Sequence, residues 1–347
     1  MVAKKEFVFN WRLITSRILS ALFFTALLIY TLWPWLTGSA RDNRTIVLYG
    51  FSILEEVMNK GIFPAFKSEW KDSTGETLSF TSSFGGSGTI TNQIIMGVPA
   101  EIAILSLELD AMRLLDNKVL KDSSWKKLPN NGIVNTTPFI FLVRPDNPKG
   151  VKDFSDLTKK GIGIVHPDPL TSGGAQWAIL AEYGSVSLTG DKESAYSQLL
   201  GIWKNVIAQA ASARAARTQF NNGFGDVLIT YEQEALVDKA KGKLKAEIIY
   251  PVSTILSEHV VVEITKNISE DQKRLVDAFI KFLWSDKAQK IFVEYGFRSF
   301  NEKFNINPDF GKIQKPFYVK DLGGWSEAKK EIVEKIWKKK VLKEVHK

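Results

Sequence analysis

Two glycine-rich turns, each leading from an apolar run into a helix-like stretch, constrain the fold of this 347-residue chain most strongly. The first turn reads FGGSGT at residues 84–89, and the second reads LTSGGAQW at residues 170–177. The first N–H groups of a helix have no intrahelical partner, and the helix dipole places roughly half a positive charge at that end. Each turn therefore offers backbone donors to an anion without a side-chain cation, and two such turns suggest a shared ligand.

Short apolar runs alternate with amphipathic stretches along most of the chain. This alternation is typical of an α/β protein with a doubly wound, mostly parallel sheet. We predict strands over residues 46–49, 78–80, 102–105, 139–143, 162–165 and 227–231, and helices over residues 55–70, 90–96, 177–182, 194–205, 270–284 and 287–295. Residues 256–264 are expected to cross back to the first half of the chain.

The N-terminal region carries a targeting pattern. Residues 18–36 are uncharged and would form a helix about 28 Å long, which is enough to cross a bilayer core. Basic residues precede this stretch, so the rest of the chain is expected outside the cytoplasm, in the periplasm or on the outer face of the inner membrane. We predict that residues 1–40 are a signal anchor, with a signal peptide cleaved near Gly38-Ser39-Ala40 and a buried helix as the alternatives.

Charge and composition exclude several classes of function. The formal charge of +8 lies largely at the two ends of the chain, and no nucleic-acid-binding module lies between them, so no nucleic-acid partner is expected. The absence of cysteine excludes disulfides, thiolate nucleophiles and cysteine-based zinc sites. The histidines His166, His259 and His346 lack partners at metal-ligand spacing, so we expect neither a metal nor a cofactor, and His166 is assigned to a loop.

Neither glycine turn matches an enzyme motif. Thr89 follows Gly88 where a nucleotide-binding P-loop has lysine, and neither Ser87 nor Ser172 has the flanking glycines of a nucleophile elbow. A secreted serine hydrolase that uses Ser87 or Ser172 remains an alternative, but the sequence shows no positioned base for it. We therefore do not predict an enzyme.

Residues 46–325 resemble the periplasmic sulfate- and thiosulfate-binding proteins of ABC importers. The matching segments are FGGSG at 84–88, GVPAEIA at 97–103, HPDP at 166–169, SGGAQW at 172–177, SAR at 212–214, GDVLI at 225–229, Glu232, Glu234-Ala235 and GGW at 323–325. The resemblance implies a two-lobed type II periplasmic binding fold in which each lobe is a doubly wound, mostly parallel sheet, preceded here by an N-terminal hydrophobic helix. On this basis lobe 1 comprises residues 41–136 plus 256–347, lobe 2 comprises residues 137–255, two crossings join them, and the partners are a sulfate-class oxyanion and importer permease subunits.

The same resemblance implies that sulfate is held in the cleft between the lobes by uncharged donors at helix N-termini. These residues are Ser87, Ser172, Gly173, Gly174 and Ala213, with Tyr231 at the position of the family's tryptophan. A site that only donates hydrogen bonds would favour sulfate over hydrogen phosphate, whose proton would find no acceptor.

Several neighbours of these residues are further candidates for contact with the ligand. They are Gly86, Gly88, Gly50, Arg214 and Arg217. Gly50 replaces the family's usual Asp, and Arg217 is an added cation. The alternative for Arg214 and Arg217 is pairing with nearby carboxylates or exposure to solvent. The alternative ligand is another oxyanion or a sulfonate, bound for sensing.

Overall fold

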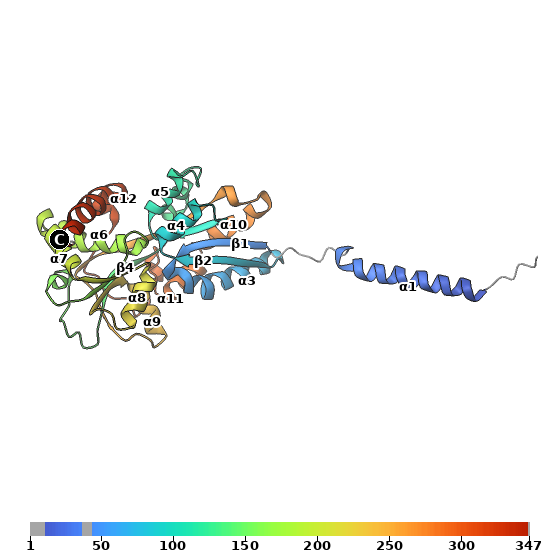
Figure 1. Cartoon of the computed structure of the whole chain (residues 1–347), viewed down its shortest axis with the longest axis horizontal. Helices are drawn as coiled ribbons and strands as arrows, with labels where there is room; N and C mark the ends of the chain where they lie inside the picture. The colour runs from blue at the N-terminus through green and yellow to red at the C-terminus, as the bar shows by residue number, and fades with distance from the viewer. Residues whose placement is uncertain (1–10, 37–43, 346–347) are drawn as a thin grey trace, which may run out of the picture.

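The computed structural model describes residues 11–36 and 44–345, and within them two α/β lobes share one continuous path of hydrogen-bonded strands (Figure 1). The strand order is β2-β1-β3-β9-β4-β7-β5-β6, with β10 beside β9 and β8 beside β4. The strands are β1 (Arg44–Phe51), β2 (Leu78–Gly85), β3 (Ile102–Leu105), β4 (Ile133–Val143), β5 (Ile164–Pro167), β6 (Val206–Ala210), β7 (Val227–Tyr231), β8 (Glu247–Ile249), β9 (Ser253–Glu263) and β10 (Lys315–Phe317).

Helices connect the strands and cover the sheets. They are α1 (Trp11–Leu36), α2 (Glu55–Val57), α3 (Phe63–Thr74), α4 (Ser87–Ile95), α5 (Glu108–Asp116), α6 (Gly173–Ser187), α7 (Lys192–Lys204), α8 (Ala213–Asn221), α9 (Glu232–Ala240), α10 (Glu270–Phe282), α11 (Asp286–Glu294), α12 (Gly324–Glu327) and α13 (Leu342–Val345). A π-helix, η9 (Ala328–Val341), joins α12 to α13, and we call residues 324–345 the C-terminal helix.

The pairing of the strands confirms the predicted fold class. In lobe 1, β1 runs parallel to β2 and β3, and in lobe 2, β5 runs parallel to β6 and β7. The long strands β4 and β9 are antiparallel to each other and extend into both lobes: β9 pairs with β3 in lobe 1, and β4 pairs with β7 in lobe 2. The predicted boundaries at 136/137 and 255/256 fall on these two strands and remain a prediction.

Each lobe buries its own aromatic side chains. In lobe 1 the ring of Phe63 stacks on Phe80 at 4.0 Å between centroids, and Phe66 packs edge to face on Phe279 at 5.1 Å. In lobe 2, every residue of α6 between positions 173 and 184 except Gln176 is buried, as expected for a helix with apolar side chains on most of its surface. Burial of each large apolar side chain stabilises the fold by about 1.5–3 kcal/mol.

The C-terminal helix packs against a different lobe from the one to which the sequence assigned it. It packs against α6 and α7 of lobe 2 (Figure 1), where Trp337 lies 5.0 Å from Trp203 and Trp325 lies 4.5 Å from Trp177 between ring centroids. Residues 256–347 were assigned to lobe 1, yet these buried tryptophans bring the end of the chain back to lobe 2. The chain therefore passes between the lobes a third time, beyond the two crossings that the sequence predicted.

Two further expectations differ from the structure. The region of residues 18–36 does form a helix, α1, drawn apart from the two lobes in Figure 1. Among the described residues, however, no helix combines the length and the apolar character required to cross a membrane, so the predicted anchor over residues 18–36 is not supported.

His166, which was expected in a loop, lies on β5 and is buried, with its Nε2 atom 3.1 Å from Glu182 Oε1.

Candidate anion-binding site

The N-termini of three helices meet around Gly86. Gly86 is the N-cap of α4, and a Cβ atom at this position would lie 2.4 Å from the carbonyl oxygen of Thr171 and 2.5 Å from that of Ala211. Thr171 and Ala211 directly precede Ser172 and Ser212, the N-caps of α6 and α8. Only glycine fits here because backbone from the other lobe would collide with any side chain, and the geometry brings both predicted glycine turns together.

The N-terminus of α4 donates hydrogen bonds to lobe 2. The N–H groups of Gly88 and Thr89 donate to the Thr171 carbonyl at 3.1 and 3.4 Å. The N–H of Gly88, which was predicted as a possible ligand contact, is therefore hydrogen-bonded to the protein itself. The N–H of Ser87, at the first position of α4, has no intrahelical partner by helix geometry.

The hydroxyl group of Ser87 points into lobe 1. Its Oγ donates to Asp110 Oδ2 at 2.6 Å and accepts from the N–H of Ser106 at 3.0 Å. Asp110 also accepts from Arg113 Nη1 at 3.0 Å, and burial raises the pKa of its carboxyl group above its usual range. Because the Ser87 hydroxyl donates a hydrogen bond to Asp110 and accepts one from Ser106, this side chain connects α4 to α5 and to the residue that follows β3.

The first turn of α6 explains why Gly173 and Gly174 are glycines. A Cβ atom on Gly173 would lie 2.8 Å from both Cβ and Oγ of Ser106, and one on Gly174 would lie 3.0 Å from the Tyr231 hydroxyl oxygen. The N–H of Ser172 donates to the Asp168 carbonyl at 2.8 Å. The N–H groups of Gly173 and Gly174 are the first two of α6 and have no partner within the helix.

Tyr231 ends β7 and lies in an aromatic wall between the lobes. Its ring lies 4.6 Å from that of Phe139 and 6.4 Å from that of Phe51, and its hydroxyl oxygen lies 2.9 Å from Ser106 Oγ. The side chain is 1% exposed, and burial raises the pKa of its hydroxyl group. The phenol at the family's tryptophan position is thus already bonded to a serine of lobe 1.

Ser106 is the residue that sequence reasoning missed. It directly follows β3, and its carbonyl accepts from Trp177 Nε1 of α6 at 2.8 Å. It belongs to no motif, and its partner Tyr231 is 125 positions away along the chain. The one available signal was its position at the carboxyl end of a strand in a mostly parallel sheet, where ligand contacts gather in this class of fold.

Three residues of α8 were candidates for contact with the ligand. In the structure, Ala213 offers a backbone donor, whereas Arg214 and Arg217 are paired with carboxylates. The side chain of Ser212 caps the N–H of Ala215 at 3.1 Å, and Ala213 is the first residue of the helix. Arg214 Nη1 lies 2.5 Å from Glu55 Oε2 of lobe 1, and Arg217 Nε lies 3.1 Å from Glu234 Oε2. Arg214 and Arg217 thus adopt the alternative arrangement, pairing with carboxylates.

Gly50 has a packing role in the structure. It lies on β1 opposite Phe84 of β2 and Ile104 of β3. A Cβ atom at this position would lie 2.9 Å from Phe84 Cε1, so glycine leaves room for that ring. Within residues 11–36 and 44–345, no group of three or more histidine and carboxylate side chains is arranged to hold a metal ion.

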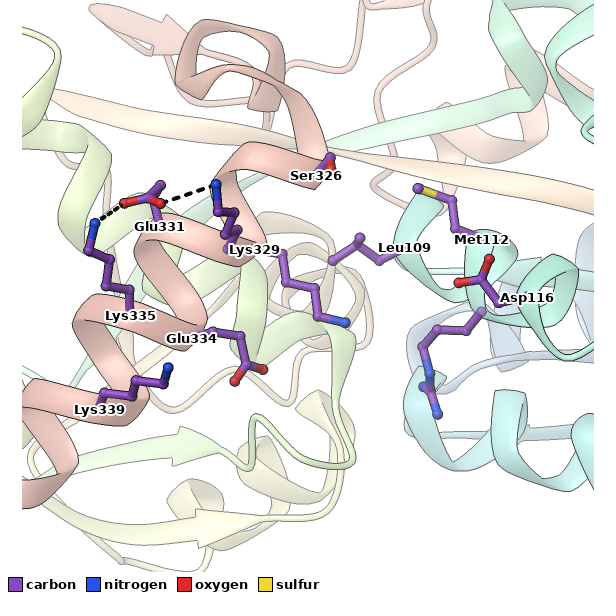
Figure 2. A pocket seen from close by; sticks show the side chains of 11 residues that line it. Leu109, Met112, Asp116, Ser326, Lys329, Glu331, Glu334, Lys335 and Lys339 are labelled. Atoms are coloured by element: carbon purple, nitrogen blue, oxygen red, sulfur yellow. Dashed lines mark hydrogen bonds and ion pairs between the residues drawn. The ribbon is translucent and has the colours of Figure 1, made fainter.

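A groove of about 580 Å³ lies between α5 of lobe 1 and the C-terminal helix (Figure 2). Leu109, Met112 and Asp116 line one wall, and the lysine-rich surface of η9 lines the other, where Lys335 pairs with Glu331 at 2.7 Å. None of the residues predicted to contact the ligand lines this groove. The candidate site is instead the meeting point of α4, α6 and α8.

Known proteins resemble this chain over most of its length. The chain is 34% identical to the sulfate-binding protein of Synechococcus elongatus over 85% of each chain, and 31% identical to the thiosulfate-binding protein of Pseudomonas aeruginosa over 85% of this chain and 91% of that protein. Its fold matches the solved structure of the sulfate-binding protein SubI from Mycobacterium tuberculosis with a TM-score of 0.76 and 27% identity, over 83% of this chain and 99% of that one. The family model of bacterial extracellular solute-binding proteins matches residues 53–298, and the chain belongs to this family.

Proposed function

We propose that this protein is an extracytoplasmic receptor that binds sulfate or thiosulfate and delivers the anion to the permease of an ABC importer. The observation that carries the proposal is the meeting of the α4, α6 and α8 N-termini around Gly86. The sulfate- and thiosulfate-binding relatives support the class of ligand.

Backbone donors and helix dipoles supply the attraction for the anion. The proposed contacts are the N–H groups of Ser87, Gly173, Gly174 and Ala213 and the hydroxyl group of Ser172. Each helix contributes about half a positive charge at its N-terminus, so three of them together complement a doubly charged anion. Because Arg214 and Arg217 pair with Glu55 and Glu234, this attraction needs no unpaired arginine.

Contacts between the lobes couple binding to closure. The bond from Gly88 N–H to the Thr171 carbonyl and the bond between Ser106 and Tyr231 both join lobe 1 to lobe 2 near the site. An anion held by donors from both lobes binds the closed arrangement better than an open one, and this difference in affinity favours closure. A permease that contacts both lobes would then distinguish the loaded receptor from the empty one.

A hydrolase that uses Ser87 receives no support from the geometry. The hydroxyl group of Ser87 donates to the buried carboxyl of Asp110, and a nucleophilic serine needs a base such as histidine at that position. The relatives that cover most of the chain are binding proteins by name.

Calorimetric titration of the full chain with sulfate, thiosulfate, molybdate and phosphate tests the proposal. We expect saturable binding of sulfate or thiosulfate at one site per chain. Binding of molybdate alone, or of none of these anions, would refute the proposed ligand class while leaving the fold assignment intact.

A further inference from the structure

Two buried hydroxyl groups, one from each lobe, lie beside the first turn of α6. Ser106 Oγ lies 2.9 Å from the Tyr231 hydroxyl oxygen, and each of the two side chains is 1% exposed. Ser106 Oγ lies 2.8 Å from the position of a Cβ atom on Gly173, and the Tyr231 hydroxyl lies 3.0 Å from that of a Cβ atom on Gly174. The hydroxyl pair therefore adjoins the backbone donors of the candidate site.

The position of Ser106 is fixed by bonds on its other polar atoms. Its N–H donates to Ser87 Oγ at 3.0 Å, and its carbonyl accepts from Trp177 Nε1 at 2.8 Å. The ring of Tyr231 is held against Phe139 and Phe51. The two oxygens thus keep their places while their hydrogens can still rotate.

A bonded pair of hydroxyls can act as either donor or acceptor. Each hydroxyl carries one proton and two lone pairs, and the bond between the two oxygens uses one proton and one lone pair. The pair keeps one proton for a third group, together with free lone pairs. Rotation of the two O–H bonds exchanges the roles of the two oxygens without moving a heavier atom, whereas backbone N–H groups can only donate.

We propose that Ser106 and Tyr231 act together as a reversible donor and acceptor that lets the site bind a protonated tetrahedral oxyanion, such as hydrogen phosphate, as well as sulfate. This inference rests on the proposed function. Toward sulfate the pair donates its free proton. Toward hydrogen phosphate, a lone pair of one of the same hydroxyls accepts a hydrogen bond from the ligand's O–H group. A site of donors alone would leave that O–H group without an acceptor.

Single and double removal of the hydroxyls tests the proposal. In the full chain, sulfate, selenate and inorganic phosphate are titrated at neutral pH, where phosphate carries at least one proton, into wild type, Ser106→Ala, Tyr231→Phe and the double variant. Each single variant keeps one hydroxyl that can donate or accept, so its sulfate-to-phosphate affinity ratio stays within about threefold of wild type. The double variant loses the acceptor, and its ratio rises about tenfold or more.

A matched control removes one tyrosine hydroxyl and one serine hydroxyl on α6, away from its first turn. The double variant Tyr183→Phe with Ser185→Ala lies near the far end of the helix and should leave the ratio unchanged. An unchanged ratio in the Ser106 and Tyr231 double variant, with sulfate still bound, would overturn this inference but not the proposed function. If the wild-type chain binds neither sulfate nor thiosulfate, the proposed function itself is refuted.

A second measurement uses the wild-type chain and does not depend on the folding of the variants. Phosphate titrations are repeated in buffers that differ in ionisation enthalpy, which reports how many protons are exchanged on binding. We expect hydrogen phosphate to bind without releasing its proton. Release of a full proton on binding, or exclusion of phosphate by more than about a thousandfold relative to sulfate, contradicts the inference.

Discussion

Gly173 has no room for a side chain, so its substitution tests the site directly. In Gly173→Asp the added Cβ would meet Ser106 at 2.8 Å, and the carboxylate would place a negative charge where the proposed anion binds. We expect the affinity for sulfate to fall at least about a hundredfold, because the aspartate carboxylate occupies the place of the anion and repels it. Aspartate in the first turn of a helix is otherwise favourable, so the chain should remain folded.

Calorimetry and circular dichroism check this expectation. Lys192→Asp is the control because it places the same carboxylate at the first residue of α7, away from the site. Wild-type sulfate affinity in folded Gly173→Asp protein would rule out the N-terminus of α6 as the anion site.

Glu258 gives the stability of the protein a pH dependence. This residue of β9 lines a groove between the lobes with Glu108 and Lys320, and burial raises the pKa of its carboxyl group to about 7. An unfolded Glu has a pKa near 4.3, so between that value and about 7 the folded state binds more protons than the unfolded state. As pH rises through this window, ionising Glu258 in the folded protein lowers the free energy of unfolding progressively, by up to about 4 kcal/mol above pH 7.

We expect Glu258→Gln to raise the free energy of unfolding at about pH 8 and to have little effect near pH 4.5. Urea unfolding of both proteins at the two pH values measures the difference. A gain in stability that is equal at both pH values would mean that packing, and not the charge, is responsible.

Ion pairs join α2 of lobe 1 to lobe 2 beside the site. Glu55 pairs with Arg214, the neighbour of Ala213 on α8, and Glu56 pairs with Lys241 just beyond α9. Pairs of this exposure are worth about 0.2–1 kcal/mol, so Glu55→Gln should speed sulfate release roughly 1.5- to 5-fold and reduce the dependence of the release rate on salt.

Stopped-flow dissociation kinetics measure this effect. Glu69→Gln is the control because Glu69 pairs with Lys287 inside lobe 1, at 3.9 Å. Equal release rates in wild type and Glu55→Gln at low salt would show that this pair does not contribute to closure.

Most of the strands that position the site could be predicted from the sequence, because buried parallel strands are continuous apolar runs bounded by turn residues. The strand β6, which leads into α8, was not predicted, because it lies at the edge of the sheet and most of its residues are not buried. The C-terminal helix could not be predicted from the sequence in this way. Its buried residues Ile332, Val333, Trp337 and Val341 belong to a π-helix, whose wider turn does not produce the 3.6-residue period, and seven lysines between residues 329 and 343 obscure the pattern further. The pairing of Ser106 with Tyr231 was equally hidden, since it depends on how the two lobes meet and not on local spacing.

The C-terminal helix adds a third connection between the lobes and packs against α6 and α7 (Figure 1). Trp337 is 4% exposed and packs edge to face on the fully buried Trp203. Truncation of a buried tryptophan to alanine costs about 3–5 kcal/mol, so Trp337→Ala should lower the free energy of unfolding by that amount. Lys339→Ala, on the exposed wall of the groove in Figure 2, should change it by less than about 0.5 kcal/mol.

Sulfate affinity should respond much less than stability to Trp337→Ala. The N-terminus of α6 is held by the bond from Trp177 to Ser106, at the end of the helix that faces lobe 1, whereas Trp337 packs on Trp203 of α7. Denaturant unfolding and calorimetry on the same protein separate the two quantities. A large parallel loss of stability and of sulfate affinity would mean that the C-terminal helix supports the geometry of the anion site directly. Residues 324–345 would then belong to the structure that forms the site in lobe 2.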